Sequence, residues 1–185
     1  MKKLRKAVGI ICIFLGICLL TYPDISTRIQ EAKVRRYVKT YECRRSREEK
    51  PLQGYGYIRI PKMDVILPLY IGDSEEHLEM GAAILKETGF PGKKNHNCII
   101  AAHRGYRGKP YFREIERLKK GDLIYVRIPE KELVYIVKAF QIIRPEETEK
   151  IKMLNGEDQI TLLTCHPYRG NGKYRYLVYA VRKSA

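Results

Sequence analysis

Apolar side chains are concentrated first in one unbroken run near the N-terminus. The run extends from Ala7 to Leu20 and is closed by Thr21, Tyr22 and Pro23, and a cluster of basic residues precedes it. A helix counted to Tyr22 has 16 residues and measures about 24 Å at about 1.5 Å per residue, which is short against a bilayer core of about 30 Å. Lys6 can extend toward the headgroups, and tyrosine suits the interface. We therefore predict that residues 1–23 form an uncleaved signal anchor that crosses the membrane once.

The flanks of this run bear on its processing and topology. A cleaved signal peptide, the main alternative, normally ends in a small-x-small site, and the segment Leu19–Pro23 contains none. A buried core helix is a second alternative. The early positive charges predict a cytoplasmic N-terminus with the remainder outside the cell, although four basic residues between Arg28 and Arg36 weaken this bias.

A polar stretch with helical periodicity follows the run. Between Asp24 and Tyr41, apolar side chains recur near one face of a helix, with arginines and lysines around them. This segment is either a solvated stalk helix or an amphipathic helix that lies on anionic lipid. Residues Glu42–Gln53 are highly charged and lead into Gly54, which is typical of a linker. Residues 24–53 are therefore predicted to be a helical stalk and linker.

From residue 54 the pattern changes to short stretches typical of β-strands, rich in β-branched and aromatic residues and bounded by turn residues. They include Gly56–Ile60, Val65–Tyr70, Cys98–Ala102, Leu123–Ile128, Leu133–Ile143, Ile160–Thr164 and Tyr176–Val181. Pro68 lies within the second stretch, so we expect an edge or bent strand there. About eight short strands at this spacing predict a mostly β domain, a closed barrel or sandwich rather than a parallel α/β sheet.

Two short helices are expected between these strands. Ser74, with two glutamates after it, favours an N-cap and a helix that reaches Met80. Residues Tyr111–Leu118 predict a second helix, which ends before two lysines and Gly121. The long polar segment Arg144–Asp158 is interpreted as a loop with one helical turn.

Charge becomes informative once it is placed along the chain. The formal net charge is +15, and residues 1–50 hold 13 of the 36 basic residues but only 5 of the 21 acidic ones. About half of the excess therefore belongs to the anchor and stalk, where it meets anionic lipid. Apolar residues make up 44% of the chain, which excludes wholesale disorder. No nucleic-acid-binding motif is present, so nucleic acid is not expected as a partner.

The chain has five cysteines, and their spacing matches no zinc-binding pattern. Two lie in the apolar run, Cys43 lies in the linker, and Cys98 lies in a predicted core strand. Three glutamates between Glu146 and Glu149 are interpreted as a solvated turn rather than as a calcium site. No metal or cofactor is therefore expected.

Three chemically active side chains stand at the ends of predicted strands. Cys165 ends one apolar stretch, His103 follows another, and Arg175 precedes the last predicted strand. A cysteine nucleophile needs a proton donor and acceptor, and usually a nearby cation that favours the thiolate. Spacing does not show that the three meet, so two interpretations stay open: a Cys–His active site, or an inert buried cysteine with a surface histidine.

Four segments resemble motifs of the sortase family, the transpeptidases of Gram-positive cell surfaces. Thr161–Cys165 resembles the T-L-x-T-C motif, Ala102–Gly105 resembles the histidine motif, and Arg175–Val178 resembles the arginine-bearing last strand. Gly56–Pro61 resembles the opening strand. The resemblance extends from about residue 54 to residue 182, nearly the whole part predicted to lie outside the membrane.

This resemblance implies a fold and a chemistry. Residues 54–185 would form the catalytic domain, an eight-stranded sortase-type β-barrel. Cys165 would attack the threonine carbonyl of an LPXTG-like sorting signal and form a thioacyl intermediate. His103 would move the protons and Arg175 would stabilise the oxyanion. An amine nucleophile would then resolve the thioester into an amide, without a metal.

Three further residues near the nucleophile are candidates for binding substrate. Thr164 would shape the oxyanion site through its backbone N–H, or would only pack against its neighbours. His166 and Tyr168 would line the groove that holds the peptide.

The residues around these motifs bear on the subclass. The segment after His103 and the sequence His166–Tyr168 look most like class C, the pilin-polymerising sortases, which join a pilin lysine during pilus assembly. The lid of that class, an aspartate followed closely by an aromatic residue, has no match between Pro23 and Gly56. The alternatives are class D-type or housekeeping attachment of surface proteins to a peptidoglycan precursor, and a membrane-tethered basic binding module.

Overall fold

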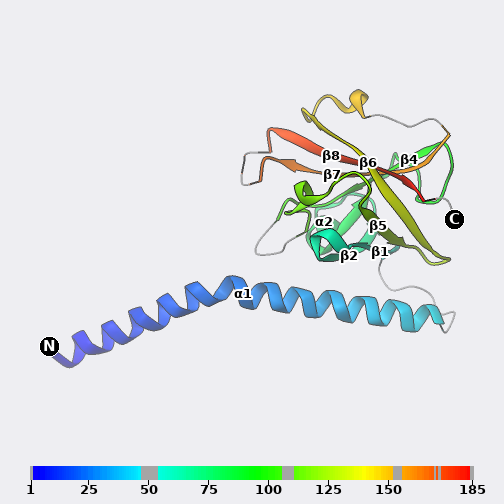
Figure 1. Cartoon of the computed structure of the whole chain (residues 1–185). Helices are drawn as coiled ribbons and strands as arrows, with labels where there is room; N and C mark the ends of the chain where they lie inside the picture. Colours follow the sequence, from blue (N-terminus) through cyan, green and yellow to red (C-terminus); the bar gives the residue numbers. More distant parts are fainter. Residues whose placement is uncertain are drawn as a thin grey trace.

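The computed structural model describes residues 2–46, 54–105, 111–151, 156–168, 170 and 172–183. A long helix, α1 (Lys2–Ser46), precedes a β domain. One half of α1 lies along the barrel beside β1 (Gly56–Ile60) and β2 (Val65–Ile71), and the N-terminal half projects away from it (Figure 1). The helix includes the first five residues of the predicted linker. The remainder of that linker, residues 47–53, lies outside the described residues.

Eight strands close into a barrel, which confirms the predicted fold. Besides β1 and β2, they are β3 (Ala82–Ile84), β4 (His96–Ala101), β5 (Leu123–Arg127), β6 (Glu132–Ile143), β7 (Asp158–His166) and β8 (Tyr174–Arg182). The order around the barrel is β1-β2-β3-β4-β7-β8-β6-β5. β2 pairs with β3 and β4 pairs with β7 in parallel, whereas the other neighbours are antiparallel. The barrel is therefore mixed rather than purely antiparallel.

Of the two alternatives that Pro68 predicts, an edge strand or a bent strand, the first is wrong, because β2 has a neighbouring strand on each side. It pairs with β1 from Val65 to Leu69 and with β3 from Leu69 to Ile71. Pro68 is compatible with this pairing because β3 starts opposite Leu69. The proline nitrogen, which carries no hydrogen, therefore needs no hydrogen bond to β3. β3 itself has no counterpart among the predicted strands, because its three residues are too few to give an alternating pattern.

The short helical elements follow the predicted positions in part. α2 (Glu75–Met80) starts as expected, because the Ser74 hydroxyl accepts a hydrogen bond from the His77 N–H at 3.3 Å. The helix predicted over Tyr111–Leu118 is wrong in extent, since only Ile115–Arg117 (η2) forms a 3₁₀ turn. The acidic loop after β6 contains one such turn, η3 (Thr148–Lys150).

The barrel interior is filled by the inward-facing residues of the strands. Those with no exposed surface include Ile58, Ile60, Leu69, Ile100, Ile124, Leu162 and Val178. Burial of such a side chain contributes roughly 1.5–3 kcal/mol. Cys98 is also fully buried, which confirms its prediction as a core residue. The closed interior holds the strand ends, and with them the candidate site, in fixed positions.

The C-terminal part of α1 is anchored to the barrel and is not a free stalk. The Tyr37 hydroxyl donates to the Gly56 carbonyl at 3.0 Å, and Glu42 pairs with Arg127 at 3.1 Å. Partial burial raises the pKa of Tyr41 to about 12. Although burial opposes it, hydrogen bonds led by the one from Arg127 hold the pKa of Glu42 below its usual value. Polar contacts at several points therefore join α1 to the β domain.

Among the described residues, no helix is both long enough and apolar enough to cross a membrane. The predicted span over residues 1–23 is thus not confirmed. The boundaries at residues 23 and 53 stay predictions.

Candidate active site

The strand ends bring the three predicted catalytic residues to one end of the barrel. β4 and β7 run parallel, with Ala101 opposite Leu163. His103 and Cys165 each come two residues later, so both emerge at the same end. Cys165 lies directly opposite Arg175 in the antiparallel pair of β7 and β8. Residues opposite each other in a ladder project from the same face, so the thiol and the guanidinium share a face.

The Cys165 thiol and the Arg175 guanidinium both lie close to Gly172. A Cβ atom placed on Gly172 would lie 3.7 Å from Cys165 Sγ and 3.7 Å from an Arg175 nitrogen. Gly172 has φ +67°, a conformation in which glycine is unstrained. The Arg175 guanidinium is fixed by donating to the Gly172 carbonyl at 2.7 Å and to that of Tyr174 at 3.2 Å. Cys165 as a residue is half-buried.

The His103 ring is supported by a tyrosine that the sequence patterns do not single out. Tyr111 packs its ring edge against His103, with centroids 5.9 Å apart and planes at 69°. Tyr111 is 1% exposed and its hydroxyl bonds the Glu79 carbonyl. Its φ of 39° is unusual for a bulky residue, and such strain is common beside functional sites. No pattern of residue types announces this conformation.

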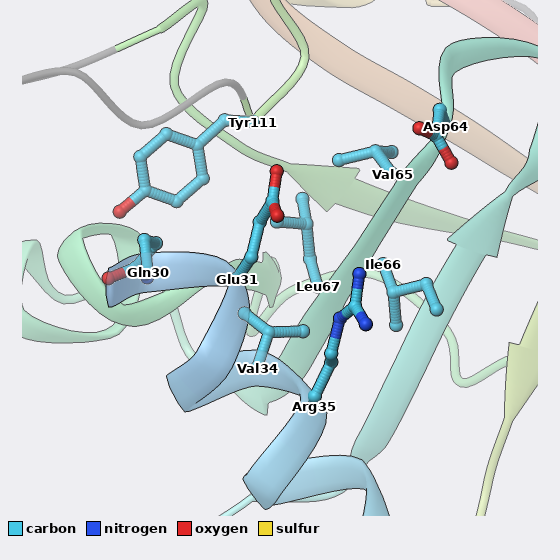
Figure 2. Close-up of a pocket in the computed structure, with 9 residues that line it drawn as sticks. All are labelled: Gln30, Glu31, Val34, Arg35, Asp64, Val65, Ile66, Leu67 and Tyr111. Atoms are coloured by element: carbon cyan, nitrogen blue, oxygen red, sulfur yellow. The ribbon is translucent and has the colours of Figure 1, made fainter. Parts of the chain in front are cut away.

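A cavity lies behind Tyr111, between α1 and β2. It has a volume of about 170 Å³. It is lined by Gln30, Glu31, Val34, Arg35, Asp64, Val65, Ile66, Leu67 and Tyr111. Figure 2 shows the Glu31 side chain pointing between Tyr111 and Leu67, with Gln30 close to the tyrosine. Helix α1 therefore extends to the residue that supports His103.

Arg104 is a second site residue that sequence reasoning missed. Its side chain is only 5% exposed and forms an ion pair with Glu116 at 2.9 Å. It donates to the carbonyls of Cys165 at 3.3 Å and Arg113 at 3.2 Å. The sequence offered one indication of this residue: Arg104 comes directly after the candidate His103, which itself follows an apolar strand.

The three predicted substrate-binding residues occupy different environments. Thr164 is 1% exposed, and its hydroxyl donates to the Ala102 carbonyl at 2.7 Å, so its side chain joins β7 to β4. His166 is half-buried and its Nδ1 lies 3.1 Å from Glu116. Tyr168 is 36% exposed, beneath the Arg113 guanidinium. Of these three residues, His166 and Tyr168 therefore have exposed side-chain surface, and Thr164 does not.

Cys98 differs from Cys165 in environment, although it lies on the neighbouring strand. It pairs with Ile160 in the middle of the β4–β7 ladder. Burial, followed by the charge of Asp158, raises the pKa of the Cys98 thiol far above its usual value. A thiol that stays protonated is a poor nucleophile. Among the residues that the structure describes, no group of three His, Cys, Asp or Glu side chains could hold a metal ion.

Comparisons with known proteins agree with this arrangement. The family model of the sortase domain matches residues 58–183. Sortase A of Bacillus anthracis is 36% identical over 126 residues, which cover 68% of this chain and 58% of that protein. Sortase D of Bacillus subtilis is 29% identical over 132 residues, which cover 70% and 64%. The chain therefore matches less than two thirds of the length of these relatives.

A solved structure shares the fold. The crystal structure of sortase C from Streptococcus pneumoniae, described as informative on catalysis and pilin substrate specificity, superposes with a TM-score of 0.69. It is 35% identical in sequence, and the match covers 74% of this chain and 69% of that one.

Proposed function

Because the chain belongs to the sortase family, we propose that it is a cysteine transpeptidase that cleaves a sorting signal and transfers the acyl part to an amine. The observation that carries this proposal is the pairing of Cys165 with Arg175 on adjacent strands, with His103 emerging at the same end. A nucleophile, a proton carrier and a fixed cation are the groups that acyl transfer through a thioester requires.

The first half-reaction forms the acyl-enzyme. The Cys165 thiolate attacks the threonine carbonyl of an LPXTG-like signal, and a carbon–sulfur bond forms. Arg175 stabilises the negative charge that develops on the carbonyl oxygen. The imidazolium of His103 then gives its proton to the departing glycine nitrogen as the threonine–glycine bond breaks. The product is a thioacyl intermediate and a free glycine amine.

The second half-reaction transfers the acyl group. An incoming amine attacks the thioester carbonyl, and neutral His103 removes its extra proton. The carbon–sulfur bond breaks, an amide forms, and Cys165 leaves as a thiolate. Neither half-reaction, as proposed, uses a metal. His166 and Tyr168 border the peptide groove, and Thr164 contributes its backbone.

We propose a pilin lysine as the amine. This finer assignment is supported by the structural likeness to sortase C of Streptococcus pneumoniae, whose description names pilin substrates. The likeness to Bacillus subtilis sortase D favours a second candidate, attachment of surface proteins to a peptidoglycan precursor. The two differ only in the amine that resolves the same thioester.

Anchoring to the cell membrane, with the catalytic domain outside, is the location proposed for this activity. It rests on the apolar run that starts at Ala7 and on the basic residues before it. Fractionation of cells, followed by protease treatment of intact protoplasts, tests it. Recovery of the protein in the soluble fraction, or protection of the barrel from protease, would contradict it.

The activity is tested with a peptide that carries an LPXTG-type signal, incubated with and without an amine. We expect a covalent thioacyl adduct on Cys165 by mass spectrometry and an amide product that appears only with the amine. Free acid as the sole product under both conditions would refute the transferase and leave a peptidase. Competition between a pilin fragment and a peptide with the amine of a peptidoglycan precursor distinguishes the two amines, and the same pilin fragment with its acceptor lysine replaced is the control.

A further inference from the structure

A buried arginine closes the gap where β4 and β7 separate, next to the candidate nucleophile. The last described pair of that ladder is Ala101 with Leu163, and the Ala102 N–H still reaches the Leu163 carbonyl at 3.2 Å. Alternate carbonyls of a strand point to the same side. The next carbonyl of β7 on the β4 side is therefore that of Cys165.

The backbone of β4 does not continue far enough to bond this carbonyl. The Arg104 guanidinium does so instead, at 3.3 Å. In a regular parallel ladder the partner would be a backbone N–H two residues beyond Ala102, and that residue is Arg104. Its side chain thus extends the hydrogen bonding of the ladder by one step. On its other side, β7 holds Cys165 through the pair with Arg175.

The guanidinium is itself held from several directions. It donates to the Arg113 carbonyl, pairs with Glu116 of η2, and lies 5.7 Å from the ring centre of Tyr176 on β8. Arginine presents its donors in a rigid planar fork, so these contacts fix its orientation. A buried charge with this many partners is costly to rearrange.

His166 adds a contact that can form in one of two ways. Its Nδ1 lies 3.3 Å from Arg104 and 3.1 Å from Glu116. Arginine only donates and a carboxylate only accepts. Nδ1 can therefore accept from Arg104 or donate to Glu116, but it cannot do both at once. Either way, His166 is tied to the cluster, which accounts for its half-buried position.

We propose that Arg104 is a positioning residue that fixes the Cys165 backbone relative to His103, and so sets the thiol–imidazole geometry of the acyl-transfer site. The proposal rests on the proposed function. Arg104 directly follows His103 and bonds Cys165, so one rigid group links the two reacting residues. A misplacement of about 1 Å at a reacting centre can cost about 100-fold in rate.

The test compares Arg104→Met, Arg104→Lys and the control Arg127→Met in the full-length chain. Arg127 also pairs with a glutamate and is 16% exposed, but its partner is Glu42 of α1. For Arg104→Met we expect a fall in kcat of roughly 10- to 100-fold, with KM for the LPXTG-type peptide within about twofold of wild type. Arg127→Met should keep kcat.

Arg104→Lys distinguishes geometry from charge. A single ammonium cannot reach the Cys165 carbonyl, the Arg113 carbonyl and Glu116 together, so we expect lysine to leave kcat low in a folded protein. Full recovery of kcat by lysine would overturn the proposal, because charge alone would then suffice. A kcat within twofold of wild type in folded Arg104→Met, or a change in KM alone, would also overturn it. If Arg104→Met does not fold, the lysine variant decides.

A second measurement is independent of the peptide substrate. Iodoacetamide labelling of Cys165 is followed by peptide mass spectrometry, with exposed Cys43 as internal reference. Without Arg104 the thiol loses its placement beside His103, and labelling of Cys165 should slow roughly tenfold while that of Cys43 is unchanged. An unchanged ratio overturns the positioning role. If wild type forms no amide product, the proposed function fails, and the labelling ratio still decides on Arg104.

Discussion

The two ends of β7 contain buried charged groups that are used in different ways. At the start of the strand, Asp158 is 7% exposed and accepts hydrogen bonds from the Tyr135 hydroxyl at 2.9 Å and the Gly92 N–H at 3.1 Å. At the other end, Cys165 is half-buried and the charges around it belong to Arg104 and Arg175. The ends are about 23 Å apart, at about 3.3 Å per residue.

The difference lies in which atoms each set of partners bonds. Of the partners of Asp158, Tyr135 is fully buried, and burial followed by the Asp158 charge raises the pKa of Tyr135 far above its usual value, which keeps it protonated as a donor. Hydrogen bonds of this kind offset the cost of burying a carboxylate, and losing one of them would destabilise the fold. At the far end, Arg104 bonds the backbone carbonyl of Cys165 and not its thiol. Strand β7 therefore has a structural hydrogen-bond network at its start and the candidate nucleophile at its other end.

The largest expected effect is on the thiol itself. Cys165→Ala should abolish transpeptidation, with a loss of about 10⁴-fold or more, because no other group can form the thioester. Cys98→Ala is the matched control, since that thiol is buried in the neighbouring strand. It should keep kcat and lower stability by about 1 kcal/mol. Rates of amide formation and melting curves check both, and equal losses of activity would remove the distinction between the two cysteines.

Removal of the imidazole comes next. His103→Ala should lower kcat about 10³-fold, because proton transfer to and from the amines is lost. His96, exposed at the opposite end of β4, provides the control, and His96→Ala should be neutral. Single-turnover kinetics with the sorting peptide measure both half-reactions. A His103 variant with normal rates would show that another group carries the proton.

A smaller loss is expected at the cation. Arg175→Ala should lower kcat about 100-fold through the lost stabilisation of the oxyanion. Arg182 at the other end of β8 is the matched position, and it lies over the Tyr135 ring. Arg182→Ala should affect thermal stability and leave kcat unchanged. If the two variants had the same kinetic effect, Arg175 would have no special role.

The smallest effect on activity is expected at the hydrogen bond between Tyr135 of β6 and Asp158 at the start of β7. Tyr135→Phe removes the hydroxyl that bonds Asp158 and leaves kcat within about twofold, while stability falls by about 1–3 kcal/mol. Thermal unfolding should register this as a shift of several degrees. A large loss of kcat without a change in melting temperature would mean that the two ends of the strand are coupled.

Much of the fold could be predicted from local patterns. The stretches Gly56–Ile60 and Ile160–Thr164 alternate or run apolar between turn residues, and both are strands in the structure. Ala82–Ile84 could not be predicted, because a three-residue strand is defined by its neighbours and not by its own pattern. The same holds for Pro68, whose fit depends on where β3 begins.

The candidate site divides in a similar way. Cys165, His103 and Arg175 could be selected because each has reactive chemistry and follows or precedes an apolar strand. Arg104 and Tyr111 were not selected, because the contacts that place them at the site are not visible in the sequence: the Cys165 carbonyl in one case and the His103 ring in the other.

The sequence by itself indicated which residues are candidates for the chemistry, through reactive side chains at strand ends and a resemblance to family motifs, and it indicated most of the stretches that form strands, because alternating burial is a local property. Only the tertiary structure decided that the strand ends of β4, β7 and β8 meet at one end of the barrel. That outcome depends on the register between strands whose residues lie about 60 positions apart in the chain, and such non-local pairing is set by the closure of the whole barrel. The contact of the buried Arg104 with the Cys165 carbonyl likewise joins residues that are distant in sequence, so only the tertiary structure shows it.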